Sequence, residues 1–211
     1  MAFTPYDAAK DTITRARALL NQAQAAGVST AVRGDMRRLA VVLAVTALDT
    51  YMHRLIVSRA YEHDTLPGGL ANLSVPFEAL IEQADAAVLA RKENRNIRPK
   101  VPAKRVLRDR LLRETFQRYD DVARALSMAG RPRGWTDTAD AMWGVPGVWT
   151  PEELKAGLNA VVDRRNRIVH EGDYERLERP QTAKLTSITA AQATRDVDFL
   201  ADVIDAIHSI V

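Results

Sequence analysis

Three residue types that can act on a phosphodiester lie close together between Arg165 and His170: an arginine, an asparagine and a histidine. Asn166 and His170 are four residues apart, so a helix would place them on the same flank. A histidine can hold or release a proton near neutral pH, as general acid–base catalysis requires. An arginine beside it binds phosphate oxygens and offsets the charge that develops in the transition state. The pattern therefore indicates proton transfer at a phosphodiester.

The same segment also permits a purely structural interpretation. Arg164, Arg165 and Arg167 could complement the dipole at the end of a helix, with His170 as a cap. Arg165, however, falls inside the apolar arc of the helical wheel, where an arginine must be paired or lie at an interface or pocket. The other members of the arc are Leu154, Leu158, Val161, Val162, Ile168 and Val169. Position alone leaves both interpretations open.

The motif lies near the end of a predicted helix that begins after Thr150. Thr150 and Glu153 can form a capping box around a proline at the first helical position, and Gly172 is a typical C-cap residue. No window alternates as a strand does. We therefore predict one all-α domain over residues 1–211, an up-and-down bundle of about six helices. They span about 5–26, 30–61, 76–92, 102–128, 151–172 and 190–210.

The second predicted helix is apolar on all sides in its middle (LAVVLAVTAL), which is typical of a buried central helix. Its longest apolar run, Leu39 to Leu48, is far shorter than the roughly 20 residues that span a bilayer, so no membrane segment is expected. Asp49 and His53 share one face of it. Asp49 either pairs with His53 within the helix or makes a core polar contact, or it reaches across the bundle to orient Arg165 or His170 in a supporting role.

Composition limits the kinds of partner and site. Apolar residues make up 46% of the chain and charged residues 27%, as in a globular protein. The net charge of +3 is compatible with a nucleic-acid partner without requiring one. There are no cysteines and the four histidines lack metal-ligand spacing, so neither a metal nor another cofactor is expected. Because no secretory signal is recognisable, the expected location is cytoplasmic.

Two connectors differ from the rest of the chain. Residues 91–105 hold seven basic residues against Glu93, with Pro99 and Pro102 expected to break any helix. This stretch is either a solvated linker or a strip that contacts phosphates. Residues 130–149 contain all three tryptophans. Such aromatic residues can stack on bases, but we favour the interpretation that they hold the loop against the bundle.

The segment Arg165-Asn166-Arg167-Ile168-Val169-His170 resembles the motif of HEPN proteins. These helical bundles carry an arginine, often followed by a polar residue, with a histidine four to six residues further on. The string RRNRIVHEGD, the helix that ends Ala47-Leu48-Asp49-Thr50-Tyr51 and the helix start ITAAQA are similar to the RiboL-PSP-HEPN branch. The resemblance extends from about Thr30 to Val211.

The resemblance implies a metal-independent endoribonuclease without cofactors that dimerises, so that two motifs face one cleft. Arg165 would hold or polarise the scissile phosphate, and His170 would act on the 2′-hydroxyl or the leaving oxygen. Asn166 would orient one of these groups or bind phosphate. Arg164 and Arg167 would contact the RNA, and the products would carry 2′,3′-cyclic phosphates. Many relatives are toxins of toxin–antitoxin systems or phage-defence effectors, so an antitoxin is a possible partner.

Two other functions remain open at this point. One is a non-catalytic HEPN binding module that partners a nucleotidyltransferase or binds nucleotide or RNA. The other is an interaction scaffold that uses no nucleic acid. Toxicity on expression and the salt dependence of RNA affinity would distinguish the three.

Overall fold

The computed structural model describes residues 3–60, 66–74, 77–93, 100–142, 149–175 and 183–211. This part of the chain is built from helices, which confirms the all-α class, and it contains nine helices where about six were predicted. They are α1 Pro5–Gln22, α2 Thr30–Arg59, α3 Gly68–Ala71, α4 Phe77–Lys92, α5 Lys100–Leu111, α6 Tyr119–Met128, α7 Gly134–Ala141, α8 Pro151–Glu171 and α9 Ala190–Ile210.

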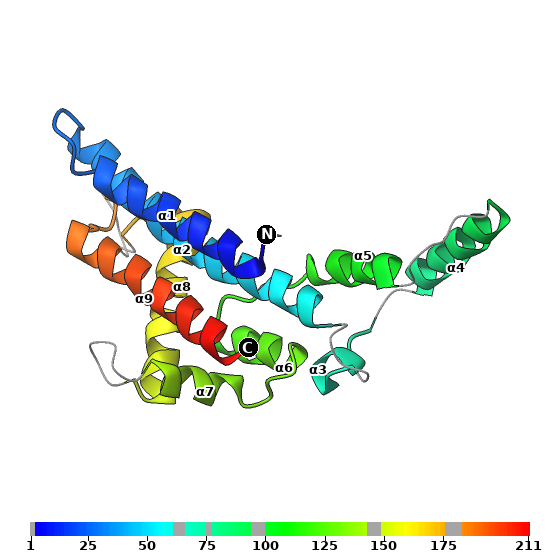
Figure 1. Ribbon diagram of the computed structural model, residues 1–211. Helices are drawn as coiled ribbons and strands as arrows, with labels where there is room; N and C mark the ends of the chain where they lie inside the picture. Colours follow the sequence, from blue (N-terminus) through cyan, green and yellow to red (C-terminus); the bar gives the residue numbers. More distant parts are fainter. Residues whose placement is uncertain (1–2, 61–65, 75–76, 94–99, 143–148, 176–182) are drawn as a thin grey trace.

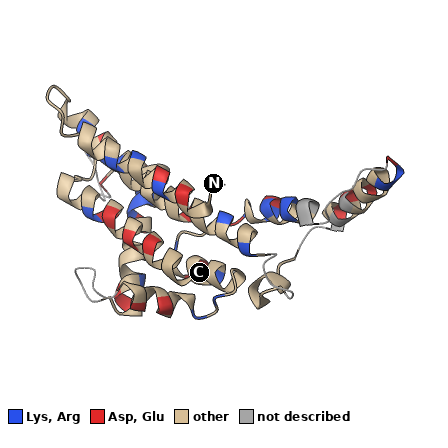
Figure 2. Ribbon diagram, in the orientation of Figure 1, with Lys and Arg blue, Asp and Glu red and all other residues tan. Residues whose placement is uncertain are grey.

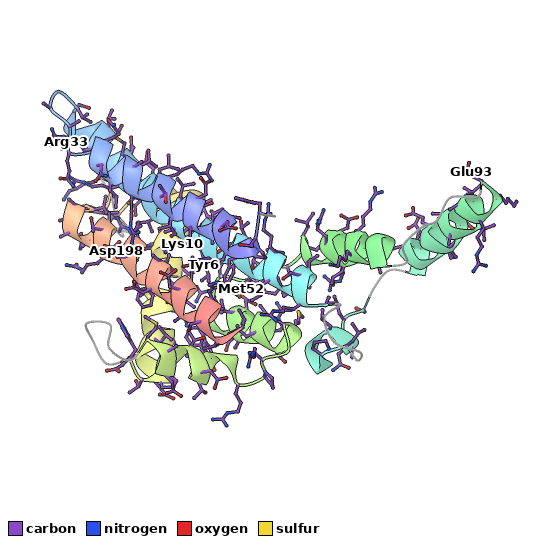
Figure 3. The ribbon with its side chains drawn as sticks, in the orientation of Figure 1. Tyr6, Lys10, Arg33, Met52, Glu93 and Asp198 are labelled. Atoms are coloured by element: carbon purple, nitrogen blue, oxygen red, sulfur yellow. The ribbon has the colours of Figure 1, made fainter. Side chains whose placement is uncertain are left out.

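The centre of the bundle is α2, which packs against α1, α6, α8 and α9 (Figure 1). Helix α1 runs antiparallel to α2, and α9 lies along both (Figure 1). Polar contacts join α1 to α9: Tyr6 and Lys10 both donate to Asp205, and Arg17 pairs with Asp198. Figure 3 labels Tyr6 and Lys10 on α1 and Asp198 on α9. The bundle thus forms around the helix that its apolar sequence marked as central.

Helix α2 has nearly the predicted bounds, and its apolar stretch extends beyond the run from Leu39 to Leu48. By length and composition it is the one helix in the described part of the chain that could cross a membrane. In this fold its apolar side chains form the core of the bundle. Those buried are Ala40, Val41, Ala44, Val45, Ala47, Leu48, Tyr51, Met52, Leu55 and Ile56.

The helix predicted over 102–128 is in fact two helices, α5 and α6, separated by residues 112–118. The carboxylate of Asp49 on α2 accepts hydrogen bonds from the Phe116 backbone N–H at 2.6 Å and from the Gln117 side chain at 3.1 Å. Phe116 is fully buried. A contact between residues far apart in the sequence therefore interrupts a stretch whose local preference is helical.

Residues 130–149 also contain more structure than predicted, because α7 lies within them. The buried Trp135 donates its indole N–H to the Pro151 carbonyl at 3.1 Å, and Trp149 packs on Phe199 of α9 with ring centroids 5.2 Å apart. For these two tryptophans the structural interpretation is confirmed. Trp143 lies outside the described residues.

Helices α4 and α5 form an arm that extends away from the bundle (Figure 1). The predicted linker 91–105 covers the end of α4 and the start of α5, while 94–99 lie outside the described residues. Pro102 does not break a helix as expected, because it occupies the first turn of α5, where backbone N–H groups lack intrahelical acceptors anyway. Basic residues gather on α5 (Figure 2), and their contact with phosphates stays a prediction.

Candidate functional site

Helix α8 carries the motif, and local interactions define both of its ends. The capping box between Thr150 and Glu153 is present, and Gly172 ends the helix with a left-handed backbone at φ 64°. Leu154 and Leu158 anchor the first half of α8 in the core. The core contacts leave the last two turns, with Arg165 and His170, at the edge of the bundle.

Arg165 is half-buried, and its charge is not neutralised by the described residues. Its Nη1 donates to Asn166 Oδ1 at 3.0 Å, whereas its buried Nε has no hydrogen-bond partner. In the part of the chain that the structure describes, no carboxylate forms an ion pair with it. Leaving a buried donor unpaired costs about 1–3 kcal/mol. Because no described contact offsets this cost, we expect the guanidinium to bind an acceptor from outside the chain.

His170 lies in the last turn of α8, is exposed and forms no hydrogen bond to any described residue. The structure therefore brings Arg165 and Asn166 into contact and leaves His170 accessible on the same helix end. Arg167 resembles Arg165, since it is half-buried and its Nε has no partner among the described residues.

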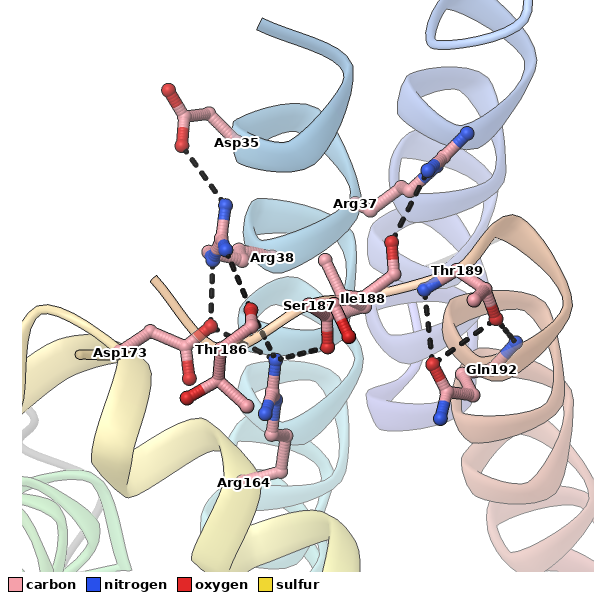
Figure 4. A network of polar contacts seen from close by, with 10 residues as sticks. All are labelled: Asp35, Arg37, Arg38, Arg164, Asp173, Thr186, Ser187, Ile188, Thr189 and Gln192. Carbon is pink, nitrogen blue, oxygen red and sulfur yellow. Dashed lines mark hydrogen bonds and ion pairs between the residues drawn. The ribbon is translucent and has the colours of Figure 1, made fainter. Parts of the chain in front are cut away.

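Arg164 donates to groups within the fold, and the RNA contact expected for it stays a prediction. Its Nη2 donates to Asp173 Oδ2 at 2.9 Å and to the carbonyls of Ser187 and Thr186 at 3.3 and 3.4 Å (Figure 4). Burial lowers the pKa of Arg164, and the charge of Asp173 offsets part of that effect. These contacts hold the segment before α9 against α8, so the guanidinium of Arg164 is already occupied.

Asp173 is the centre of this network and follows directly after the C-cap glycine. It is 0% exposed, and its Oδ2 also accepts from Arg38 Nε of α2 at 2.6 Å (Figure 4). Its Oδ1 has no hydrogen-bond partner among the described residues, and its backbone adopts φ 58°, which is unusual for a residue with a side chain. Arg38 also donates to the Thr186 carbonyl at 2.8 Å. One buried carboxylate thus connects α2, α8 and the segment before α9.

Sequence reasoning missed Asp173 and Arg38. Two signals were present: an aspartate that follows Gly172 at the end of the motif string, and the pair Arg37-Arg38 at the border of the apolar run of α2. Neither signal reveals by itself that the two side chains meet, because they are 135 residues apart.

Asp49 does not support the motif in the way that was considered. Its carboxylate contacts Phe116, Gln117 and, at 3.6 Å, His53 Nε2. Among the described residues no hydrogen bond or ion pair joins it to Arg165 or His170, so the contacts seen favour a structural role. Within the described ranges, His, Asp and Glu side chains form no group of three that could hold a metal ion.

The family model described as RiboL-PSP-HEPN matches residues 10–211. The chain belongs to this HEPN family. A comparison with curated proteins and with solved structures gives no significant match. The family match begins inside α1, earlier than the predicted start at Thr30, so α1 is part of the HEPN domain. It also covers the motif helix and the Asp173 network, which places both within the HEPN module.

Proposed function

We propose that this HEPN protein is a metal-independent endoribonuclease. The observation that carries the proposal is the state of Arg165, a half-buried cation at the same helix end as the exposed His170. Among the described residues its side chain donates a hydrogen bond only to Asn166. A polyanionic substrate would provide the acceptor that the described residues do not. HEPN domains often act as ribonucleases or nucleotide-binding modules, which agrees with this assignment.

In the proposed reaction the ribose 2′-oxygen attacks phosphorus and the bond to the 5′-oxygen breaks. The products are a 2′,3′-cyclic phosphate and a 5′-hydroxyl. His170 takes the proton from the 2′-hydroxyl or gives one to the leaving oxygen. Arg165 offsets the charge that grows on the phosphate oxygens. The Oδ1 atom of Asn166 accepts from Arg165, so its amide N–H groups are available to bind phosphate or ribose.

We further propose that two copies of the chain form one cleft. A single histidine cannot take one proton and donate another in the same step, whereas two copies of His170 can divide these tasks. HEPN domains often act as dimers and bind RNA. Val169, next to His170, is 48% exposed and is suited to contact a second copy. A toxin or phage-defence effector in the cytoplasm, restrained by an antitoxin, is the biological role we propose.

The test is RNA cleavage by purified protein in the presence of EDTA. Wild type should cleave total RNA and leave 2′,3′-cyclic phosphate ends, whereas Arg165→Ala and His170→Ala should lose about 100-fold or more of the rate. Arg15→Ala, which removes an exposed arginine of α1, should cleave like wild type. If wild type is folded and binds RNA without cleaving it, the function is instead that of a non-catalytic binding module, with a nucleotidyltransferase as a candidate partner.

A growth experiment tests the same proposal in cells. Expression of wild type should slow growth, and His170→Ala should relieve the defect at equal protein level. A binding module or scaffold would be harmless in both forms, and equal growth of the two strains would contradict the toxin role.

A further inference from the structure

Tyr174 is an exposed aromatic residue close to the motif, and it has no role in the site described so far. Its residue surface is 51% exposed. It follows His170 by four positions, and a β-bridge pairs it with Leu185. An exposed tyrosine is common, but one held rigidly beside a proposed active site requires an explanation.

The backbone on both sides of Tyr174 is fixed. The Thr186 N–H donates to the Asp173 carbonyl at 2.7 Å, and the Glu175 N–H donates to the Lys184 carbonyl at 2.8 Å. The preceding residue, Asp173, is held by two half-buried arginines, Arg38 and Arg164. A ring on such a support loses little conformational entropy when a ligand binds, which favours its use in recognition.

Gly172 brings the ring close to the end of α8. A Cβ atom at Gly172 would lie 3.0 Å from Tyr174 Cε2 and 3.3 Å from Cδ2, so a side chain there would push the ring away by a few tenths of an ångström. The Cα atoms of His170 and Gly172 are two peptide units apart, at most about 7.6 Å. The ring therefore lies at the same end of α8 as His170.

We propose that Tyr174 stacks on a nucleobase of the RNA beside the scissile phosphate. The inference rests on the proposed function for the place of the phosphate. Every base has a π-face, so stacking on one tyrosine binds single-stranded RNA with little sequence preference. The cations on the last turns of α8 favour RNA over a protein partner. Arg165 and Arg167 have no carboxylate partner among the described residues, and a protein interface would desolvate these charges, whereas phosphates neutralise them.

The test measures binding without cleavage, on a His170→Ala background, by fluorescence anisotropy of labelled oligouridylate and oligoadenylate of about 12 nucleotides. Tyr174→Phe should keep the Kd. Tyr174→Ala and Tyr174→Leu should raise it by about 5- to 150-fold, because leucine retains apolar surface but cannot stack. The salt dependence of binding should stay unchanged, since the lost contact is uncharged. Leu112→Ala removes an exposed apolar side chain elsewhere and should have no effect.

Several outcomes would overturn the proposal: equal Kd values for all variants, binding by Tyr174→Leu as tight as by tyrosine, or no measurable binding of either oligonucleotide. Sedimentation of Tyr174→Ala is a further control, because conversion of a dimer to monomers would show that the ring serves contact between copies. Binding and cleavage fail separately. If Tyr174→Ala loses affinity but wild type does not cleave RNA, the stacking site is retained and the nuclease is refuted. If wild type cleaves RNA but Tyr174→Ala binds as tightly as tyrosine, the nuclease is retained and the stacking site is refuted.

Discussion

Arg164 and Arg165 are adjacent in the sequence and about 100° apart around α8, and their surroundings differ completely. Arg164 donates to a buried carboxylate and to two backbone carbonyls. Arg165 donates to one neighbouring amide, and its Nε has no hydrogen-bond partner in the described part of the chain. The comparison teaches that residue type and spacing identify a basic helix end, whereas the acceptors around each guanidinium decide which arginine stabilises the fold and which is available to a substrate.

The strongest expected effect is that of Asp173→Asn, which disrupts the contacts of Arg164. Asparagine tolerates the positive φ of this position, so the substitution removes the charge and leaves the backbone unstrained. Because Arg38 and Arg164 lose their shared carboxylate, the free energy of unfolding should fall by about 3–5 kcal/mol, measured by urea denaturation. Asp35→Ala, which removes a 71% exposed partner of Arg38, is the control and should change stability by less than about 0.5 kcal/mol. A stability loss as small as that of the control would show that the network is not structural.

Substitution of the neighbouring arginine, Arg165→Ala, should lower the cleavage activity and leave the stability unchanged. We expect a loss of about 100- to 1,000-fold in single-turnover RNA cleavage, because one charge that stabilises the transition state is removed. Arg165→Lys should recover little, since an ammonium group lacks the planar fork that binds two phosphate oxygens. The Tm should remain at the wild-type value or rise, because an unpaired buried donor disappears. A marked fall in Tm would instead make Arg165 a second structural arginine.

Asp49→Ala tests whether the carboxylate of Asp49 supports Arg165 or His170. The substitution leaves the Phe116 N–H without its acceptor, so the free energy of unfolding should fall by about 1–3 kcal/mol. The cleavage rate per folded molecule should be unchanged, because no contact connects Asp49 with the motif. Loss of cleavage in a variant shown to be folded by circular dichroism would restore the supporting role.

The smallest effect is expected at Asp196, a residue of α9 whose carboxyl group is near Arg164 of α8. Burial raises the pKa of its carboxyl group, and Arg195 and Arg164 offset only part of that effect. A raised pKa means that ionisation opposes folding, and this cost is complete above the folded-state pKa and vanishes as the pH falls toward the unfolded-state value. Asp196→Asn should therefore raise the Tm by about 1–2 °C at pH 8, with a smaller gain at pH 4, in a thermal scan at both pH values. A lower Tm at pH 8 would show that the attraction to the two arginines outweighs desolvation.

The parts of the fold that local interactions determine were predictable. Thr150, Glu153 and Gly172 define the ends of α8 through contacts within a few residues, and both ends were predicted correctly. The prediction of one continuous helix over 102–128 was wrong, because the Phe116 N–H donates to Asp49 of α2 and not to a carbonyl of its own helix. No signal within residues 112–118 shows that contact.

The sequence by itself determined that the chain is helical, that α2 is central, and that Arg165, Asn166 and His170 share one helix end, since these properties follow from periodicity, caps and spacing. Only the tertiary structure decided that Arg164 is buried against Asp173, that Arg165 is left unpaired, and that Tyr174 lies over Gly172. Burial and pairing depend on which distant elements approach a residue. Those approaches result from packing of the whole bundle, which no local pattern encodes.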